Sequence, residues 1–131
     1  MIGKRTVVSQ EASDKYAADA ELARQFDELL ERARVAEQEF RDAQAASAPE
    51  DRLRGLGKRL DAALTDVMRS AFAAQRVEIG PRGYDDWIYR RKALATPTVH
   101  ALTREAQRLL TLREAHRLTG IPRLPRASSA A

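Results

Sequence analysis

The sequence contains no cysteine. Disulfide bonds and thiolate metal sites are therefore excluded, and nothing points to the oxidising compartment of secreted proteins. Long apolar runs are also missing: no window approaches the about 20 apolar residues that span a bilayer, and the first residues lack the apolar core of a signal peptide. We therefore expect a cytoplasmic protein with no membrane partner.

Aromatic residues are scarce as well. The 131 residues include three Phe, three Tyr and one Trp, and much of the 44% hydrophobic content is alanine. Strands are rich in β-branched and aromatic residues, whereas alanine has the highest helix propensity. A chain of this length can bury one substantial core. The composition therefore predicts a single all-α domain.

The longest predicted helix covers residues 10–46, where neither glycine nor proline occurs. Ser9 is suited to cap its first turn. Apolar residues recur at alternating spacings of four and three, which is the a/d seam of a helix that packs against another helix. The seam begins only at Leu22, so we expect the earlier turns to project as a free arm. Its members are Leu22, Phe26, Leu29, Ala33, Ala36, Phe40 and Ala43.

A second helix is predicted over residues 50–75, because Pro49 suits the first helical position. Gly55 and Gly57 weaken its first turns by about 1 kcal/mol each relative to alanine, so regular helix is expected from Lys58 onwards. Its apolar stripe contains Leu53, Leu56, Leu60, Leu64, Val67, Ala71 and Ala74.

The small residues of the first seam, set between Phe26 and Phe40, suit close antiparallel packing of these two helices. We therefore predict a long, coiled-coil-like antiparallel helical hairpin, and with it an elongated particle. The alternative is a coiled coil in which the seam packs against a second chain.

Shorter elements are predicted after residue 76. Apolar residues alternate briefly over 77–79, which indicates a short extended piece before the turn signalled by Gly80 and Pro81. Asp85 or Asp86 can then cap a short helix. The predicted organisation is a flexible N-terminus (1–9), a single helical domain (10–118) and a disordered basic tail (119–131). The helices of the domain are predicted over 10–46, 50–75, 85–95 and 97–118. Thr96 is expected to cap the last helix, with Pro97 at its first position.

Charge is distributed unevenly along the chain. Residues 1–66 carry 11 Lys or Arg against 14 Asp or Glu, whereas residues 67–131 carry 12 against 5. The basic half can pair with the acidic half of the same chain or of a neighbour, or it can attract nucleic acid or another polyanion. Pairing between helices is the preferred interpretation.

The densest mixture of aromatic and basic groups covers residues 84–92. Its aromatics can stack on bases while its cations meet phosphates. The preferred interpretation is that Trp87 and Ile88 pack under the bundle, with Arg91 over the Trp87 ring. The candidate contacts for a polyanion or a protein partner are Trp87, Arg90, Arg91, Lys92, Arg104, Arg108 and Arg117.

No motif for chemistry is complete. Residues 55–59 fail as a phosphate-binding loop, because arginines replace the first glycine and the magnesium-binding hydroxyl. His100 and His116 stand 16 residues apart, without the spacing of a metal site. Asp85 and Asp86 are more readily explained as helix caps than as catalytic acids. We therefore predict no metal, no cofactor, no small-molecule substrate and no enzymatic activity.

The segment 111–123 resembles the first helix and turn of bacterial helix-turn-helix proteins, in which Glu-Ala and Thr-Gly-Ile lead into a recognition helix. It then departs from that family, because Pro125 stands where the recognition helix would run. The same letters predict a helix stop of the Schellman type at Gly120.

Together these features predict a non-enzymatic helical interaction or assembly protein. It would act through helix packing and its basic C-terminal half, with itself or a larger complex as partner. The alternative is a nucleic-acid-binding accessory protein that contacts phosphates through the C-terminal basic residues.

Overall fold

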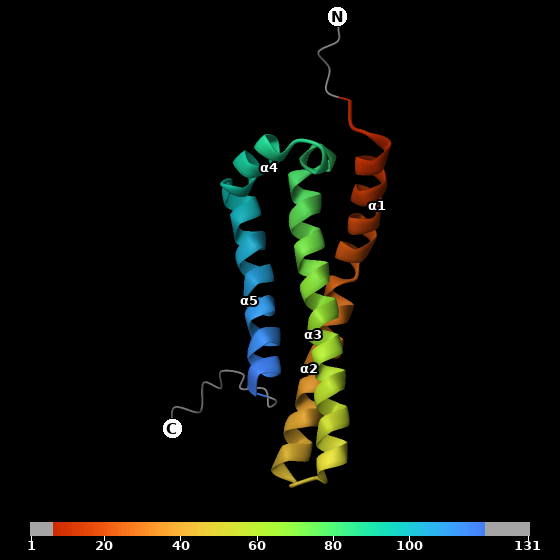
Figure 1. The fold of residues 1–131 in the computed structure, drawn as a ribbon, viewed down its shortest axis with the longest axis vertical. Helices are drawn as coiled ribbons and strands as arrows, with labels where there is room; N and C mark the ends of the chain where they lie inside the picture. The colour runs from red at the N-terminus through yellow and green to blue at the C-terminus, as the bar shows by residue number, and fades with distance from the viewer. Residues whose placement is uncertain (1–6, 120–131) are drawn as a thin grey trace, which may run out of the picture.

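The computed structural model describes residues 7–119, and all regular structure in that range is helical (Figure 1). The elements are α1 (Gln10–Arg24), α2 (Phe26–Ala45), α3 (Glu50–Ile79), the 3-10 turn η1 (Pro81–Tyr84), α4 (Trp87–Leu94) and α5 (Pro97–Thr119). The predicted all-α fold is confirmed. The predicted flexible N-terminus and disordered tail lie almost entirely outside the described residues.

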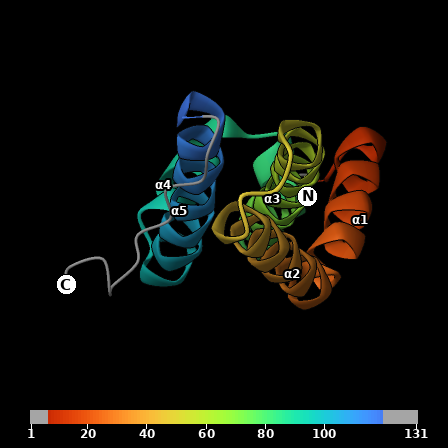
Figure 2. The same cartoon turned by 90° about the horizontal axis from the view of Figure 1, so that it is seen from below.

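Helix α3 is the centre of an elongated bundle. It contacts α1, α2 and α5, and these helices run antiparallel to it (Figure 1). Viewed along the bundle, α1 and α5 lie on opposite sides of α3 (Figure 2). Helix α4 and the turn η1 join the end of α3 to the start of α5.

The core follows the predicted seams. The structure buries Leu29, Ala33, Ala36, Phe40 and Ala43 of α2 against Leu56, Leu60, Leu64, Val67 and Ala71 of α3, with Ala106 and Leu109 of α5 completing the cluster. Leu22 and Phe26 are partly buried against it. The first seam therefore packs within the described chain, between α2 and α3.

The first helix is not continuous, and the prediction of one unbroken helix over 10–46 is wrong. At Gln25 the backbone leaves the α-helical region (φ −89°, ψ 3°), and its N–H donates to the Leu22 carbonyl at 3.1 Å. The Ser70 hydroxyl of α3 donates to the same carbonyl at 2.9 Å. The break redirects α1 along α3.

The sequence pattern predicted a free arm before Leu22, and this prediction is wrong, because α1 packs on the bundle. Ala12 in its first turn is buried, and Asp19 forms an ion pair with Arg76 of α3. Polar contacts hold this segment where the apolar seam is absent. A pattern search for apolar residues alone does not detect such contacts.

Helix α3 is longer than predicted and extends to Ile79 instead of Gln75. The residues 77–79, predicted to be extended, form its last turn, because the buried side chains of Gln75 and Ile79 continue its packed face. The helix also begins at Glu50, so Gly55 and Gly57 lie inside it and do not delay its start.

Two predicted caps are present, and a third is not. The Ser9 hydroxyl accepts a hydrogen bond from the Ala12 N–H, and the Asp86 carboxylate accepts one from the Tyr89 N–H, each at 3.0 Å. Thr96 does not cap α5 with its side chain, which donates instead to the Ala93 carbonyl. Asp85 accepts hydrogen bonds from the Ser9 N–H and hydroxyl, both at 2.8 Å, and so ties the start of α1 to the α4 end of the bundle.

Gly80, directly after the end of α3, and Gly55, inside α3, are expected to change stability in opposite directions when replaced by alanine. Gly80 has φ +103° and ψ 169°, a conformation open to glycine almost alone, so Gly80→Ala should destabilise the fold by about 1–3 kcal/mol. Gly55 lies inside the helix with no atom within 4 Å of an added Cβ, so Gly55→Ala should stabilise it by about 1 kcal/mol. Urea unfolding of both variants measures the difference; equal effects would contradict it.

Candidate interaction surface

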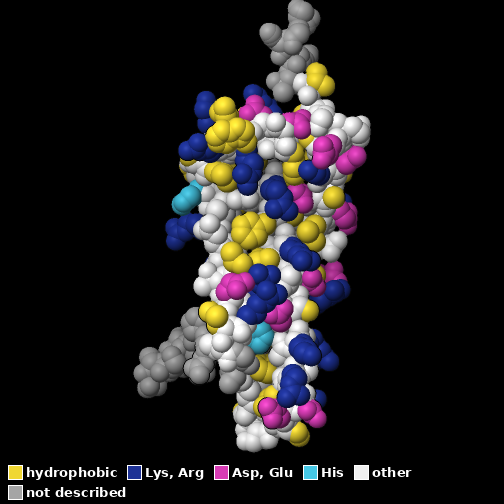
Figure 3. All heavy atoms as spheres, in the orientation of Figure 1, with side chains coloured by type: hydrophobic (Ala, Val, Ile, Leu, Met, Phe, Trp, Pro, Cys, Tyr) yellow, Lys and Arg dark blue, Asp and Glu magenta, His cyan; other side chains and the backbone are white. Residues whose placement is uncertain are grey.

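Exposed aromatic and basic side chains meet on α4. Trp87 is 64% exposed and Ile88 is 54% exposed, and no residue of α4 is buried. The Arg91 guanidinium lies over the Trp87 ring, 5.5 Å from its centroid. These two residues, with Ile88 and Lys92, line a shallow hollow; we call the four residues the α4 patch. Figure 3 shows hydrophobic and basic side chains side by side at this end of the bundle.

The predicted packing of Trp87 and Ile88 under the bundle is wrong, whereas the predicted stacking of Arg91 on the Trp87 ring is confirmed. Trp87 is the first residue after the Asp86 cap, in the exposed first turn of α4. The half-buried Tyr89 and Leu94 face the bundle in its place.

The turn η1 determines how α4 is presented. Arg82 forms an ion pair with Asp86 at 3.3 Å and lies over the Tyr89 ring at 4.5 Å. Gly83 packs so closely against Ile79 that an added Cβ would lie 2.6 Å from the Ile79 Cγ2 atom. The α4 patch is therefore held by contacts behind it and presented to solvent.

A half-buried polar cluster fastens η1 to α1. The Asp19 carboxylate accepts hydrogen bonds from Arg76 at 2.7 and 3.1 Å, and a further one from the Tyr84 hydroxyl. Burial acts to raise the pKa of Asp19, but the hydrogen bonds and the Arg76 charge outweigh it and hold that pKa below its ordinary value. Burial and the contact with Asp19 raise the pKa of the Tyr84 hydroxyl.

The other candidate cations divide into free and engaged groups. Arg90, Lys92 and Arg104 are exposed, and none of them forms an ion pair with a residue in the range 7–119. Arg108 pairs with Glu105 of its own helix at 2.7 Å. Among these candidate residues, the ones without an ion pair therefore lie on α4 and on the first turns of α5.

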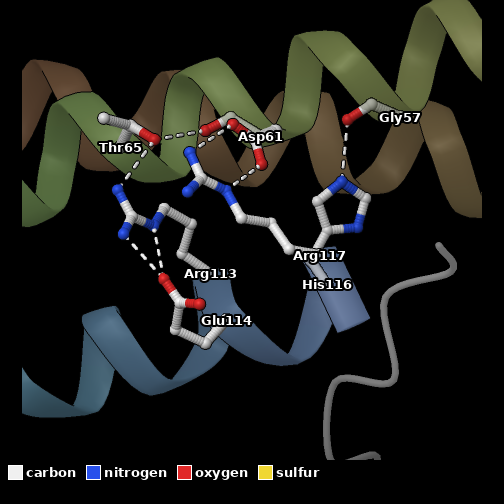
Figure 4. A network of polar contacts seen from close by, with 7 residues as sticks. All are labelled: Gly57, Asp61, Thr65, Arg113, Glu114, His116 and Arg117. Carbon is white, nitrogen blue, oxygen red and sulfur yellow. Dashed lines mark hydrogen bonds and ion pairs between the residues drawn. The ribbon is translucent and has the colours of Figure 1, made fainter. Parts of the chain in front are cut away.

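Arg117 forms an ion pair within the bundle. Its guanidinium donates to both carboxylate oxygens of Asp61 on α3, at 2.7 and 3.1 Å (Figure 4). The hydrogen bond from Arg117 and its positive charge hold the pKa of Asp61 below its ordinary value. Here the basic half of the sequence meets the acidic half of the same chain.

The two histidines have different environments and do not meet. His116 is 5% exposed, and its Nε2 lies 2.7 Å from the Gly57 carbonyl, to which it donates (Figure 4). Its ring and the Phe40 ring form an edge-to-face pair with their centroids 6.0 Å apart. His100 is exposed. Sequence reasoning did not detect the contact of Gly57, Phe40 and His116; a glycine inside a predicted helix was its only signal.

No protein-family model, curated protein or solved structure matches this chain.

Within residues 7–119, no group of acidic or histidine side chains is arranged to hold a metal ion, and no helix is long and apolar enough to cross a bilayer. The Gly120 helix stop and the helix-turn-helix resemblance beyond it fall outside the described residues. The α4 patch, where the exposed Trp87 ring lies beside Arg91, is the candidate site.

Proposed function

We propose that the chain is a non-enzymatic helical interaction protein that binds a protein partner through the α4 patch. The exposure of Trp87 carries this proposal, because the only tryptophan of the chain lies outside the core and beside an arginine. Tryptophan and arginine are the residues most enriched among those that dominate binding energy at interfaces.

The composition of the patch indicates the chemistry of the partner. Trp87 and Ile88 require an apolar pocket, whereas Arg91 and Lys92 require acidic groups around it. The expected partner is a protein surface with an apolar depression bordered by Asp or Glu. Because the patch lies at one end of an elongated bundle, the rest of the molecule can serve as a spacer within an assembly.

The variant Trp87→Ala tests this proposal. We expect it to weaken partner binding by about 2 kcal/mol or more, roughly 30-fold, because it removes the anchor. Mass spectrometry identifies proteins that the immobilised wild-type chain retains and the variant does not. Each such protein is then added to the wild-type chain while Trp87 fluorescence is followed, and the emission should shift to the blue as the ring is covered.

The matched control is Leu118→Ala. Leu118 is also a large exposed apolar residue, but it lies at the far end of α5. This variant should bind as the wild type does. If Trp87→Ala and Leu118→Ala retain the same proteins with the same affinity, the α4 patch is not the binding surface.

A nucleic-acid-binding accessory protein is the second candidate. The free cations Arg90 and Lys92 on the same helix as the exposed Trp87 ring, with Arg104 on α5, support it, since cations beside an aromatic ring suit single-stranded nucleic acid. Titration with single-stranded and duplex oligonucleotides at low salt should then show binding that weakens steeply as salt rises. Absence of binding at low salt would eliminate this candidate.

A further inference from the structure

A second surface lies between α2 and α3, away from the α4 patch. It is a groove with an apolar floor that includes Val35, which is 47% exposed. On α3, Asp61 and Thr65 contact α5, whereas Ala62 and Asp66 line this groove, so it opens on the opposite side from α5. The lining residues are Leu29, Glu31, Arg32, Val35, Ala36, Glu39, Arg59, Ala62, Ala63 and Asp66.

Four of the charges that border the groove form an alternating pattern. Glu39 of α2 forms an ion pair with Arg59 of α3 at 3.2 Å, which fixes the relative level of the two antiparallel helices. Two turns away, Arg32 of α2 therefore lies at about the level of Asp66 of α3. The signs alternate along each helix and across the groove, with Val35 and its neighbours in the centre.

We propose that a second copy of this chain occupies the groove, related by a two-fold axis perpendicular to the helices. Such an axis turns each helix end for end. Arg32 then faces Glu39 of the partner subunit, and Asp66 faces Arg59 of the partner subunit. The pattern is thus complementary to itself, as an isologous interface requires.

The position of α1 determines the direction of the second copy. Ser70, which contacts α1, lies one turn beyond Asp66 and continues the face of α3 that carries Arg59 and Asp66. Helix α1 therefore covers this face of α3 towards the C-terminal end of α3, and the groove occupies the same face nearer its N-terminal end. A parallel copy would place two α1 helices between the same two α3 helices, whereas an antiparallel copy avoids this clash.

The groove lies midway along α2. From Val35 to the break at Gln25 is about 15 Å of helix, and from Val35 to the end of α2 at Ala45 is also about 15 Å. Small residues at the centre, Ala36, Ala62 and Ala63, let the helices approach closely, as in a four-helix bundle.

Charge reversal tests this arrangement. Light scattering of the wild-type chain should give twice the 14.6 kDa mass of the chain. R32E and E39R, each prepared alone, place like charges opposite one another twice across the interface and should raise the dimer dissociation constant at least tenfold. Mixing the two variants restores both attractive pairs, so the mixture should form a heterodimer.

The controls separate assembly from folding and from the α4 patch. Arg34→Glu makes the same charge change on α2 but outside the groove, and it should remain dimeric. Circular dichroism should show equal helicity for all of these variants. Trp87→Ala should give the same dimer mass as the wild type by light scattering. Loss of dimerisation is thereby distinguished from loss of partner binding through the α4 patch. A monomeric wild type at high concentration, or a mixture of R32E and E39R that stays monomeric, would overturn the inference.

Discussion

Phe40→Ala is expected to reduce the free energy of unfolding by about 3–5 kcal/mol, the range for removing a fully buried aromatic ring. Phe40 is 2% exposed and lies where α2, α3 and α5 meet. Its ring contacts the Gly57 backbone region and the His116 ring. The surrounding helices are joined on several sides, so they cannot collapse readily into the space that the variant creates.

Urea unfolding measures this loss, with Gln38→Ala as the control on the exposed side of the same helix. The control should change stability by no more than about 0.5 kcal/mol. Phe40→Leu, which retains most of the apolar volume, should lose less than Phe40→Ala. A loss below about 1 kcal/mol for Phe40→Ala would show that this junction does not support the packing of α5.

The core of the bundle was predictable because its signal is local. The spacing of Leu29, Ala33, Ala36 and Phe40 alone identifies one packed helical face, and the same holds for Leu60 and its neighbours in α3. Proline and glycine likewise locate the loop near Pro49 and the turn at Gly80. Each of these inferences depends on residues within a few turns of one another.

The break at Gln25 was not predictable in this way, because no glycine or proline marks it. At the break the Leu22 carbonyl accepts a hydrogen bond from Ser70, which is 48 residues away in sequence. The buried His116 donates in the same way to the carbonyl of Gly57, 59 residues earlier. Long-range polar contacts of this kind leave no periodic pattern in the sequence.

The candidate site was found by composition, but its exposure was misjudged. The mixture of aromatic and basic residues identified residues 84–92, and general preference assigned the Trp87 ring to the core. In the structure the half-buried aromatic residue of α4 is Tyr89, which contacts Arg82 of η1, whereas Trp87 next to the Asp86 cap is exposed. Hydrophobicity alone does not distinguish these two positions.

Asp19→Asn is expected to reduce the free energy of unfolding by about 2 kcal/mol at neutral pH. It removes the charge that pairs with Arg76 and accepts from Tyr84, and leaves both donors poorly satisfied. The effect is smaller than the about 3–5 kcal/mol of a fully buried broken pair, because the Arg76 side chain is 37% exposed and water can solvate it. Asp27→Asn, at an exposed position on α2, should have little effect.

The same contact makes a specific contribution to acid sensitivity. The pKa of Asp19 is lower in the folded than in the unfolded chain, so its stabilisation is complete above the unfolded value of about 4 and is lost as pH falls through the folded value. The stability difference between wild type and Asp19→Asn should therefore be constant at neutral pH and shrink below about pH 4. Thermal or urea unfolding across this range measures it. A difference that stays unchanged in acid would show that Asp19 acts through shape, and that its charge does not hold α1 to the bundle.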